Sequence, residues 1–193
     1  MEKKINKFLL YYLVTLFIFG IFFLYEKHTV GNDSTISEWL INYSGGFTKR
    51  GIIGQLSIYI SNLFNFSLRE TILIFQISIL LIYFLTLYSF FKNINQNKII
   101  LLAVFTPIFI LYPIAEIEVL ARKEIFIFTF FLFYLSLNSN VYRVIYKITI
   151  LPLAVLIWEP VIFFFSFWLA IDIIEERIKK IDKNFFKIIF TFL

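Results

Sequence analysis

The sequence lacks the residues from which disulfides and most metal centres are built. Its 193 residues include no cysteine and one histidine, His28. The chain therefore has no disulfide and no thiolate metal ligand, and a single histidine does not make a histidine-based metal site. Internal repeats and low-complexity linkers are also absent from the sequence. We expect no metal and no cofactor.

Hydrophobic side chains, in contrast, dominate the composition. They make up 60% of the residues, 21% of the residues are aromatic, and the mean hydropathy is +0.85. A soluble domain is about 45–50% apolar, and a chain of this size buries only about 70% of its unfolded surface. Many of the 27 phenylalanines would therefore remain on a wet surface. The composition predicts a membrane protein whose first partner is lipid.

The basic residues do not indicate a nucleic-acid partner. The formal net charge is +5, but the 18 lysines and arginines are scattered among short segments between apolar runs. Nucleic-acid binding surfaces gather such residues in one patch or stripe. We interpret the charge as contact with lipid headgroups and as a topology signal.

The apolar runs predict an all-α, polytopic transmembrane bundle of about five or six helices, which forms one domain over residues 1–193. A bilayer core of about 30 Å needs about 20 apolar residues per helix. Runs near this length cover about 8–25, 71–91, 99–115, 125–140 and 148–171, with a partial run at 185–193. The last run is too short to cross, so we expect a truncated product or a fragment of a longer protein.

Charge sets the expected orientation. Glu2-Lys3-Lys4-Ile5-Asn6-Lys7 precedes the first apolar run, and no small-residue cleavage site follows that run. This pattern predicts an uncleaved anchor with a cytoplasmic N-terminus. Residues 26–70 then form an extracytoplasmic loop.

The run 148–171 allows two topologies because Trp158-Glu159-Pro160 interrupts it. We favour one spanning helix, since the run has bilayer length and a proline obliges only a kink. A re-entrant hairpin or broken helix is the alternative. It would return the cationic residues that follow to the cytoplasm, as the positive-inside tendency favours: Arg177, Lys179, Lys180, Lys183 and Lys187.

A glycine-rich segment in the predicted loop is the best candidate for an anion site. Gly45, Gly46 and Gly51 flank Lys49 and Arg50. Glycines let backbone N–H groups approach an anion, and the two cations could neutralise a phosphate. An apolar face follows and predicts an amphipathic helix on the membrane: Ile52, Ile53, Leu56, Tyr59, Ile60, Leu63 and Phe64. The plainer alternative is a turn that docks this helix on lipid phosphate.

A second charged segment, residues 116–124, lies between two predicted helices on the same side as the glycine loop. On a helical continuation Glu118 and Arg122 are four residues apart and could form a surface ion pair. In a wet cleft, Arg122 and Lys123 could instead bind a diphosphate while Glu118 serves as a base.

Glu159 is the third candidate, because the predicted spanning helix would place it near the middle of the membrane. A carboxylate there costs at least about 2.5–3.5 kcal/mol unless it is paired or hydrated. It could donate or accept a proton, or it could remain a neutral acid bonded to carbonyls that Pro160 leaves free.

Three motifs together resemble bacterial surface-polysaccharide membrane proteins described as EpsG-like or Wzy-type repeat-unit polymerases. They are Asn42-Tyr43-Ser44-Gly45-Gly46-Phe47-Thr48-Lys49-Arg50-Gly51, Arg122-Lys123-Glu124 and Trp158-Glu159-Pro160, under a fifth of the chain. The resemblance implies a glycosyltransferase that acts on polyprenyl-diphosphate-linked sugars beside other membrane proteins of polysaccharide assembly.

On this hypothesis Arg50 and Arg122 bind the diphosphate leaving group, and Glu118 or Glu159 deprotonates the acceptor hydroxyl. Two alternatives remain open. One is a transporter or channel-like protein in which the broken helix at Glu159-Pro160 forms a proton or solute site. The other is a non-catalytic subunit or a truncated fragment.

Overall fold

The computed structural model describes residues 2–31, 33–93 and 118–174. The described chain is all-α, as the sequence predicts. Its helices are α1 (Glu2–Val30), α2 (Asp33–Trp39), α3 (Gly51–Phe64), α4 (Leu68–Asn93), α7 (Glu124–Ser136), α8 (Asn140–Ile157) and α9 (Val161–Ile174). The predicted runs at 99–115 and 185–193 lie outside the described residues.

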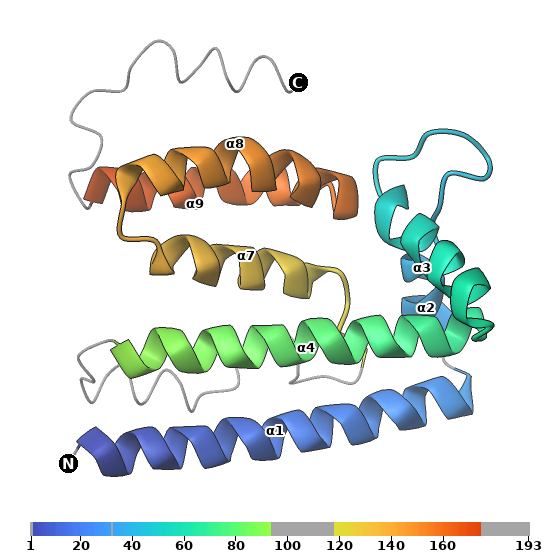
Figure 1. The fold of residues 1–193 in the computed structure, drawn as a ribbon, viewed down its shortest axis with the longest axis horizontal. Coiled ribbons are helices and arrows are strands. Elements are labelled where there is room, and N and C mark those ends of the chain that lie inside the picture. Colours follow the sequence, from blue (N-terminus) through green and yellow to red (C-terminus); the bar gives the residue numbers. More distant parts are fainter. Residues whose placement is uncertain (1, 32, 94–117, 175–193) are drawn as a thin grey trace.

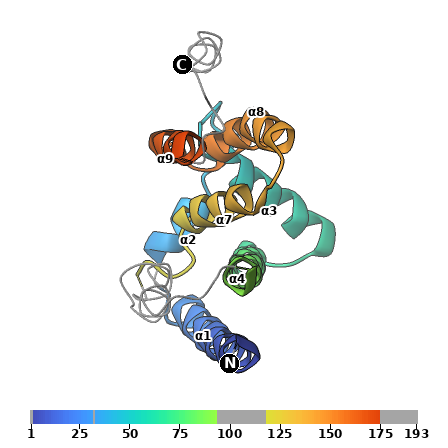
Figure 2. The same cartoon turned by 90° about the vertical axis from the view of Figure 1, so that its left-hand side faces the viewer.

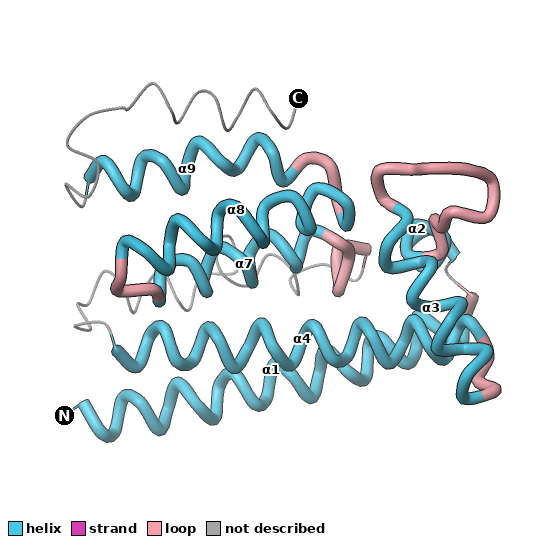
Figure 3. Tube along the Cα trace, turned by 45° about the horizontal axis from the view of Figure 1, so that its top comes forward, coloured by secondary structure: helices cyan, strands magenta, loops and turns pink. Residues whose placement is uncertain are grey.

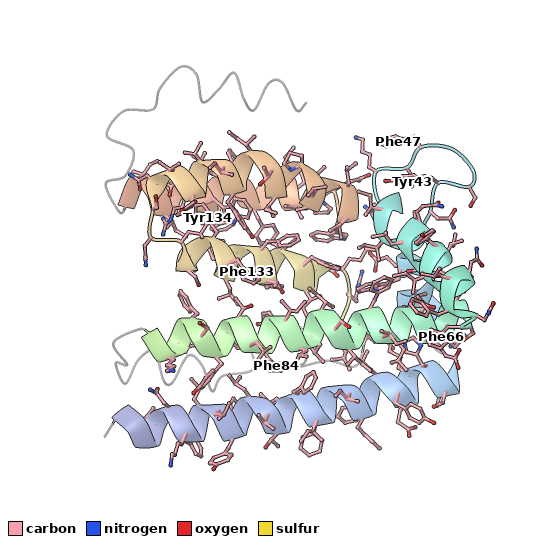
Figure 4. The ribbon with its side chains drawn as sticks, viewed as in Figure 1. Tyr43, Phe47, Phe66, Phe84, Phe133 and Tyr134 are labelled. Carbon is pink, nitrogen blue, oxygen red and sulfur yellow. The ribbon has the colours of Figure 1, made fainter. Side chains whose placement is uncertain are left out.

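α1 and α4 are the longest helices and lie antiparallel, side by side (Figures 1 and 2). They contain 29 and 26 residues, so each extends over roughly 40 Å, which exceeds the bilayer core of about 30 Å. Leu9, Leu13 and Leu87 belong to the buried core. Phe17 of α1 meets Phe84 of α4 edge to face with ring centroids 6.0 Å apart (Figure 4). The predicted helices 8–25 and 71–91 are thus present in longer form.

The remaining long elements stack on the other side of α4. α7 packs against α4, and α8 and α9 form an antiparallel pair beyond it (Figures 1 and 2). Within the described residues, three helices are long and apolar enough to cross a membrane: Ile5–Val30, Leu68–Lys92 and Asn140–Ile157. Exposed apolar side chains such as Phe8, Tyr11 and Val144 would face lipid. These candidate spans indicate a multi-pass membrane protein.

The structure differs from the predicted helices over 125–140 and 148–171. α7 ends at Ser136 and α8 begins at Asn140, so α8 takes up residues that the sequence assigned to a connector. α8 ends at Ile157, and α9 starts at Val161. Trp158 is extended, with φ −156° and ψ 111°, which allows the chain to turn before Pro160. The favoured single helix over 148–171 is therefore wrong, and a helical hairpin replaces it.

The predicted loop 26–70 contains two helices at one end of the molecule. α3 runs steeply across the direction of α4 (Figures 1 and 3). The predicted helix after Gly51 is present, and Leu56, Tyr59, Leu63 and Phe64 are exposed along it. Ile53 is instead buried, together with the small residues of α3: Gly51, Gly54, Ser57 and Ser61.

An ion cluster is buried at the other end of the α7, α8 and α9 stack. Asp172 of α9 accepts hydrogen bonds from Lys147 Nζ at 2.6 Å and from Arg143 at 3.2 Å. Arg143 Nε also donates to the carbonyl of Leu137, which follows α7, at 2.7 Å. The Tyr134 ring lies 4.9 Å from the Arg143 guanidinium (Figure 4). We call Arg143, Lys147 and Asp172 the buried triad.

Candidate functional site

Six charged side chains meet where three loops converge at the end opposite the buried triad. The loops are residues 40–50, the segment before α7 and the turn between α8 and α9 (Figure 3). One set of contacts joins Arg50 to Glu159 and Lys123, and another joins Arg122 to Glu38 and Glu124. The two sets are connected through the chain, where Lys123 follows Arg122, and we call the six residues the open cluster: Glu38, Arg50, Arg122, Lys123, Glu124 and Glu159.

The glycine segment folds as a tight turn before α3. Asn42 Oδ1 accepts a hydrogen bond from the backbone N–H of Ser44 at 2.8 Å, and the N–H of Gly46 donates to the Tyr43 carbonyl at 3.1 Å. Gly46 has φ +118°, a conformation that favours glycine. The N–H of Gly51 donates to the Thr48 carbonyl at 3.3 Å. The amides of Gly46 and Gly51 are thus engaged in hydrogen bonds within turns, and the anion loop that the sequence suggested stays a prediction.

Two glycines also bring the turn against α3. A side chain at Gly51 would collide with the Tyr43 ring, and one at Gly54 would collide with the backbone carbonyl of Ile41. Gly45 has open space around it. The Tyr43 ring stacks on Phe47 with centroids 5.8 Å apart (Figure 4). Sequence reasoning missed Gly54, although a glycine inside a helical pattern was a usable signal.

Arg50 stands directly before α3, as predicted, and pairs with Glu159. Arg50 Nη2 lies 3.5 Å from Glu159 Oε2, and the two side chains are 36% and 42% exposed. Glu159 therefore lies in the turn between α8 and α9 and not inside a continuous helix. The prediction failed because the apolar run around it hid a turn that carries Glu159 to the end of α8.

Arg122 joins two further carboxylates. Its Nε lies 3.5 Å from Glu38 Oε2, and its Nη2 lies 3.4 Å from Glu124 Oε1. The arginine side chain is 40% exposed. The contact between Glu38 and Arg122 could not be read from the sequence, because the two residues lie far apart along the chain. Lys49, the other predicted phosphate ligand, is exposed beside Arg50.

The predicted helical continuation from Glu118 to Arg122 is wrong. Residues 118–121 form a turn, and Ala121 has φ +51°. Glu118 is exposed, and its backbone carbonyl accepts a hydrogen bond from Lys27 Nζ of α1 at 3.5 Å. Arg122 reaches Glu38 and Glu124 from this turn.

Lys123 is the buried member of the open cluster and connects the segment of Arg50 with the segment of Arg122. The side chain is fully buried, and its Nζ donates to the Arg50 carbonyl at 3.1 Å. Burial disfavours the charged form and lowers the pKa of Lys123 to about 8; Glu38 raises it and Arg50 lowers it further. The two segments that the sequence placed on one side of the membrane therefore meet.

The donor chemistry of the open cluster suits anions. Guanidinium and ammonium groups bind phosphate oxygens by charge-assisted hydrogen bonds. In the described part of the chain, no group of three or more histidine, aspartate or glutamate side chains is placed to hold a metal ion. Comparison with family models, curated proteins and solved structures finds no match. Functional inference therefore depends on the cluster itself.

Proposed function

We propose that this chain is a multi-pass inner-membrane protein of cell-surface polysaccharide assembly whose open cluster binds a polyprenyl-diphosphate-linked sugar. The observation that carries the proposal is the bond from Lys123 Nζ to the Arg50 carbonyl, which brings the segments of Arg50 and Arg122 together at one end of the helices. A diphosphate that links a sugar to a membrane lipid lies at this level, where charge meets apolar surface. The motif resemblance to repeat-unit polymerases points to the same substrate class.

The pairs in the open cluster favour exchange with a ligand. Arg50 and Arg122 are each more than a third exposed, and their carboxylate contacts are 3.4 to 3.5 Å long. Exposed ion pairs of this kind contribute about 0–1 kcal/mol. A diphosphate offers more charge and a bidentate fit to guanidinium. It could therefore replace the carboxylates at low cost.

The proposed reaction transfers a sugar from the diphosphate to an acceptor hydroxyl. The acceptor oxygen forms a bond to the anomeric carbon, and the bond from that carbon to the diphosphate oxygen breaks. Arg50 and Arg122 stabilise the charge on the departing polyprenyl diphosphate. Glu159 takes the acceptor proton after the diphosphate displaces it from Arg50, and exposed Glu118 is the alternative base.

The surroundings of the open cluster suit a lipid-linked substrate. α3 exposes Tyr59, Leu63 and Phe64, as expected of an amphipathic helix in the membrane interface. The hairpin returns the chain to the end where α1 begins, which removes the charge conflict of a spanning helix over 148–171. We propose that the open cluster faces away from the cytoplasm.

The transporter alternative required a break at Glu159-Pro160, and the chain does turn there, between α8 and α9. In this turn Glu159 pairs with Arg50. We favour the transferase because that pair belongs to the open cluster.

Replacing Arg50 and Arg122 separately by alanine tests the proposal. We expect each variant, at normal expression, to shorten the glycan ladder on a gel by a large fraction, because each lacks one of the two guanidinium groups that bind the departing diphosphate. Lys92→Ala is the matched control, since Lys92 is exposed at the far end of α4. Normal ladders in both arginine variants would refute the proposal.

A further inference from the structure

A chain of hydrogen bonds connects α1 and α4 to the turn that carries Arg122 and Lys123. Arg69 Nη1 donates to the His28 carbonyl at 3.0 Å, and His28 Nε2 lies 2.7 Å from Gln76 Oε1. Gln76 Nε2 donates to the Ala121 carbonyl at 3.3 Å. Gln76 is fully buried. This amide is therefore one point at which the helix pair holds the turn, and the bond from Lys27 Nζ to the Glu118 carbonyl is another.

The contacts fix the direction of each bond. The Gln76 NH₂ group donates to a carbonyl, so its Oε1 is the acceptor that faces His28. His28 must then carry a proton on Nε2, which assigns its tautomer from the hydrogen-bond network. An amide without partners in an apolar interior would cost several kcal/mol. This arrangement satisfies Gln76 at both ends.

The residue whose carbonyl accepts the Gln76 hydrogen bond has a strained backbone conformation. Ala121 has φ +51°, a left-handed conformation that costs an alanine roughly 1–2 kcal/mol. Such conformations persist where surrounding contacts hold them. Arg122 follows directly, its N–H donates to the Val119 carbonyl at 3.2 Å, and Lys123 reaches the Arg50 carbonyl. The conformation at Ala121 therefore sets the directions in which the side chains of Arg122 and Lys123 extend from the turn.

We infer that Gln76 is a positioning residue that holds the Ala121 turn so that Arg122 faces a bound diphosphate and the buried Lys123 keeps its bond to the Arg50 carbonyl. His28 fixes the orientation of the Gln76 amide. The inference rests on the proposed function for its ligand, but not for the placement of the turn. Gln76 touches no substrate in this account and acts through the two cations.

Gln76→Leu tests the inference in the full chain, purified in lipid nanodiscs. We expect its affinity for inorganic diphosphate, measured by isothermal titration, to fall about tenfold or more, because small misplacements of binding groups are costly. His28→Leu should have a smaller effect. Ser78→Leu is the matched control, since Ser78 is exposed and bonds only the Ile74 carbonyl in its own helix.

A thiol probe separates the two claims. The chain has no cysteine, and Leu120 is 1% exposed beside the strained residue. We expect Leu120→Cys to react slowly with N-ethylmaleimide and to react faster once Gln76→Leu is added. Unchanged labelling, or unchanged diphosphate affinity in Gln76→Leu when the wild type binds, would overturn the positioning role. Faster labelling in a protein whose wild type binds no diphosphate would support the positioning and refute the proposed function.

Discussion

The open cluster and the buried triad use the same side-chain chemistry in opposite ways. Pairs in the open cluster are 3.4 to 3.5 Å long, and its arginines are more than a third exposed. In the buried triad the two contacts to Asp172 measure 2.6 and 3.2 Å, and the side chains are at most 11% exposed. A buried ion pair of this kind is thus less able than an exposed pair to exchange its partner for a ligand.

The difference follows from where the residues stand in the fold. Arg143 and Lys147 are four residues apart on α8, so one helix face presents both to Asp172 of α9. Arg50, Arg122 and Glu159 of the open cluster lie on turns instead, and each side chain is more than a third exposed. We therefore assign the buried triad to holding the α7, α8 and α9 stack together and the open cluster to ligand binding.

Asp172→Asn should have the largest effect on stability. It leaves two cations buried without their counter-ion, which typically costs about 3–5 kcal/mol. Loss of helical circular dichroism during denaturation by sodium dodecyl sulfate in mixed micelles measures the change. Glu159→Gln is the matched control, because an exposed pair contributes at most about 1 kcal/mol. Equal destabilisation by the two variants would remove the distinction between the clusters.

Glu159→Gln should instead change ligand binding. Removing the carboxylate frees Arg50, so we expect inorganic diphosphate to bind up to about fivefold more tightly, the equivalent of about 1 kcal/mol. The glycan ladder should nevertheless shorten if Glu159 takes the acceptor proton. Weaker diphosphate binding in this variant would show that the Arg50–Glu159 pair does not occupy the ligand site.

The pH dependence of binding gives the smallest expected effect. The pKa of Lys123 is lowered to about 8 by burial, so the charge at the base of the open cluster is lost as pH rises through this value. Diphosphate affinity should fall over that interval, and Lys123→Met should abolish this step. A pH profile that is identical in the variant would exclude Lys123 from the site.

Stability should follow the opposite course over the same interval. The folded-state pKa lies below the ordinary value of 10.5, so the unfolded chain binds the Lys123 proton more tightly. Folding is penalised at low pH, and the penalty lifts as pH rises from about 8 toward the unfolded pKa. The opposite signs distinguish a loss of binding from a loss of folded protein.

The sequence revealed the features that depend on local pattern. Continuous apolar runs predicted α1 and α4, and the spacing of exposed Leu56, Tyr59 and Leu63 predicted α3. The topology of these runs also placed the segments of Arg50 and Arg122 on one side. In the structure, the Lys123 bond to the Arg50 carbonyl joins the two segments.

Features that depend on three-dimensional contact were not predictable in the same way. Trp158-Glu159-Pro160 interrupts the apolar run 148–171, but this pattern fits both a kinked helix and a turn, and the contact of Glu159 with Arg50 depends on a distant segment. The partners of Arg122 depend on how α2 sits beside α7, which no spacing encodes. Gln76 was a visible amide within an apolar run, but its partners come from α1 and from the Ala121 turn.

Isothermal titration of inorganic diphosphate into the full chain in nanodiscs tests the central claim most directly. The account predicts saturable binding by the wild type and by Lys92→Ala, and its loss in the double variant Arg50→Ala/Arg122→Ala with no change in stability. Equal binding by the wild type and the double variant, or no binding by the wild type, would contradict it.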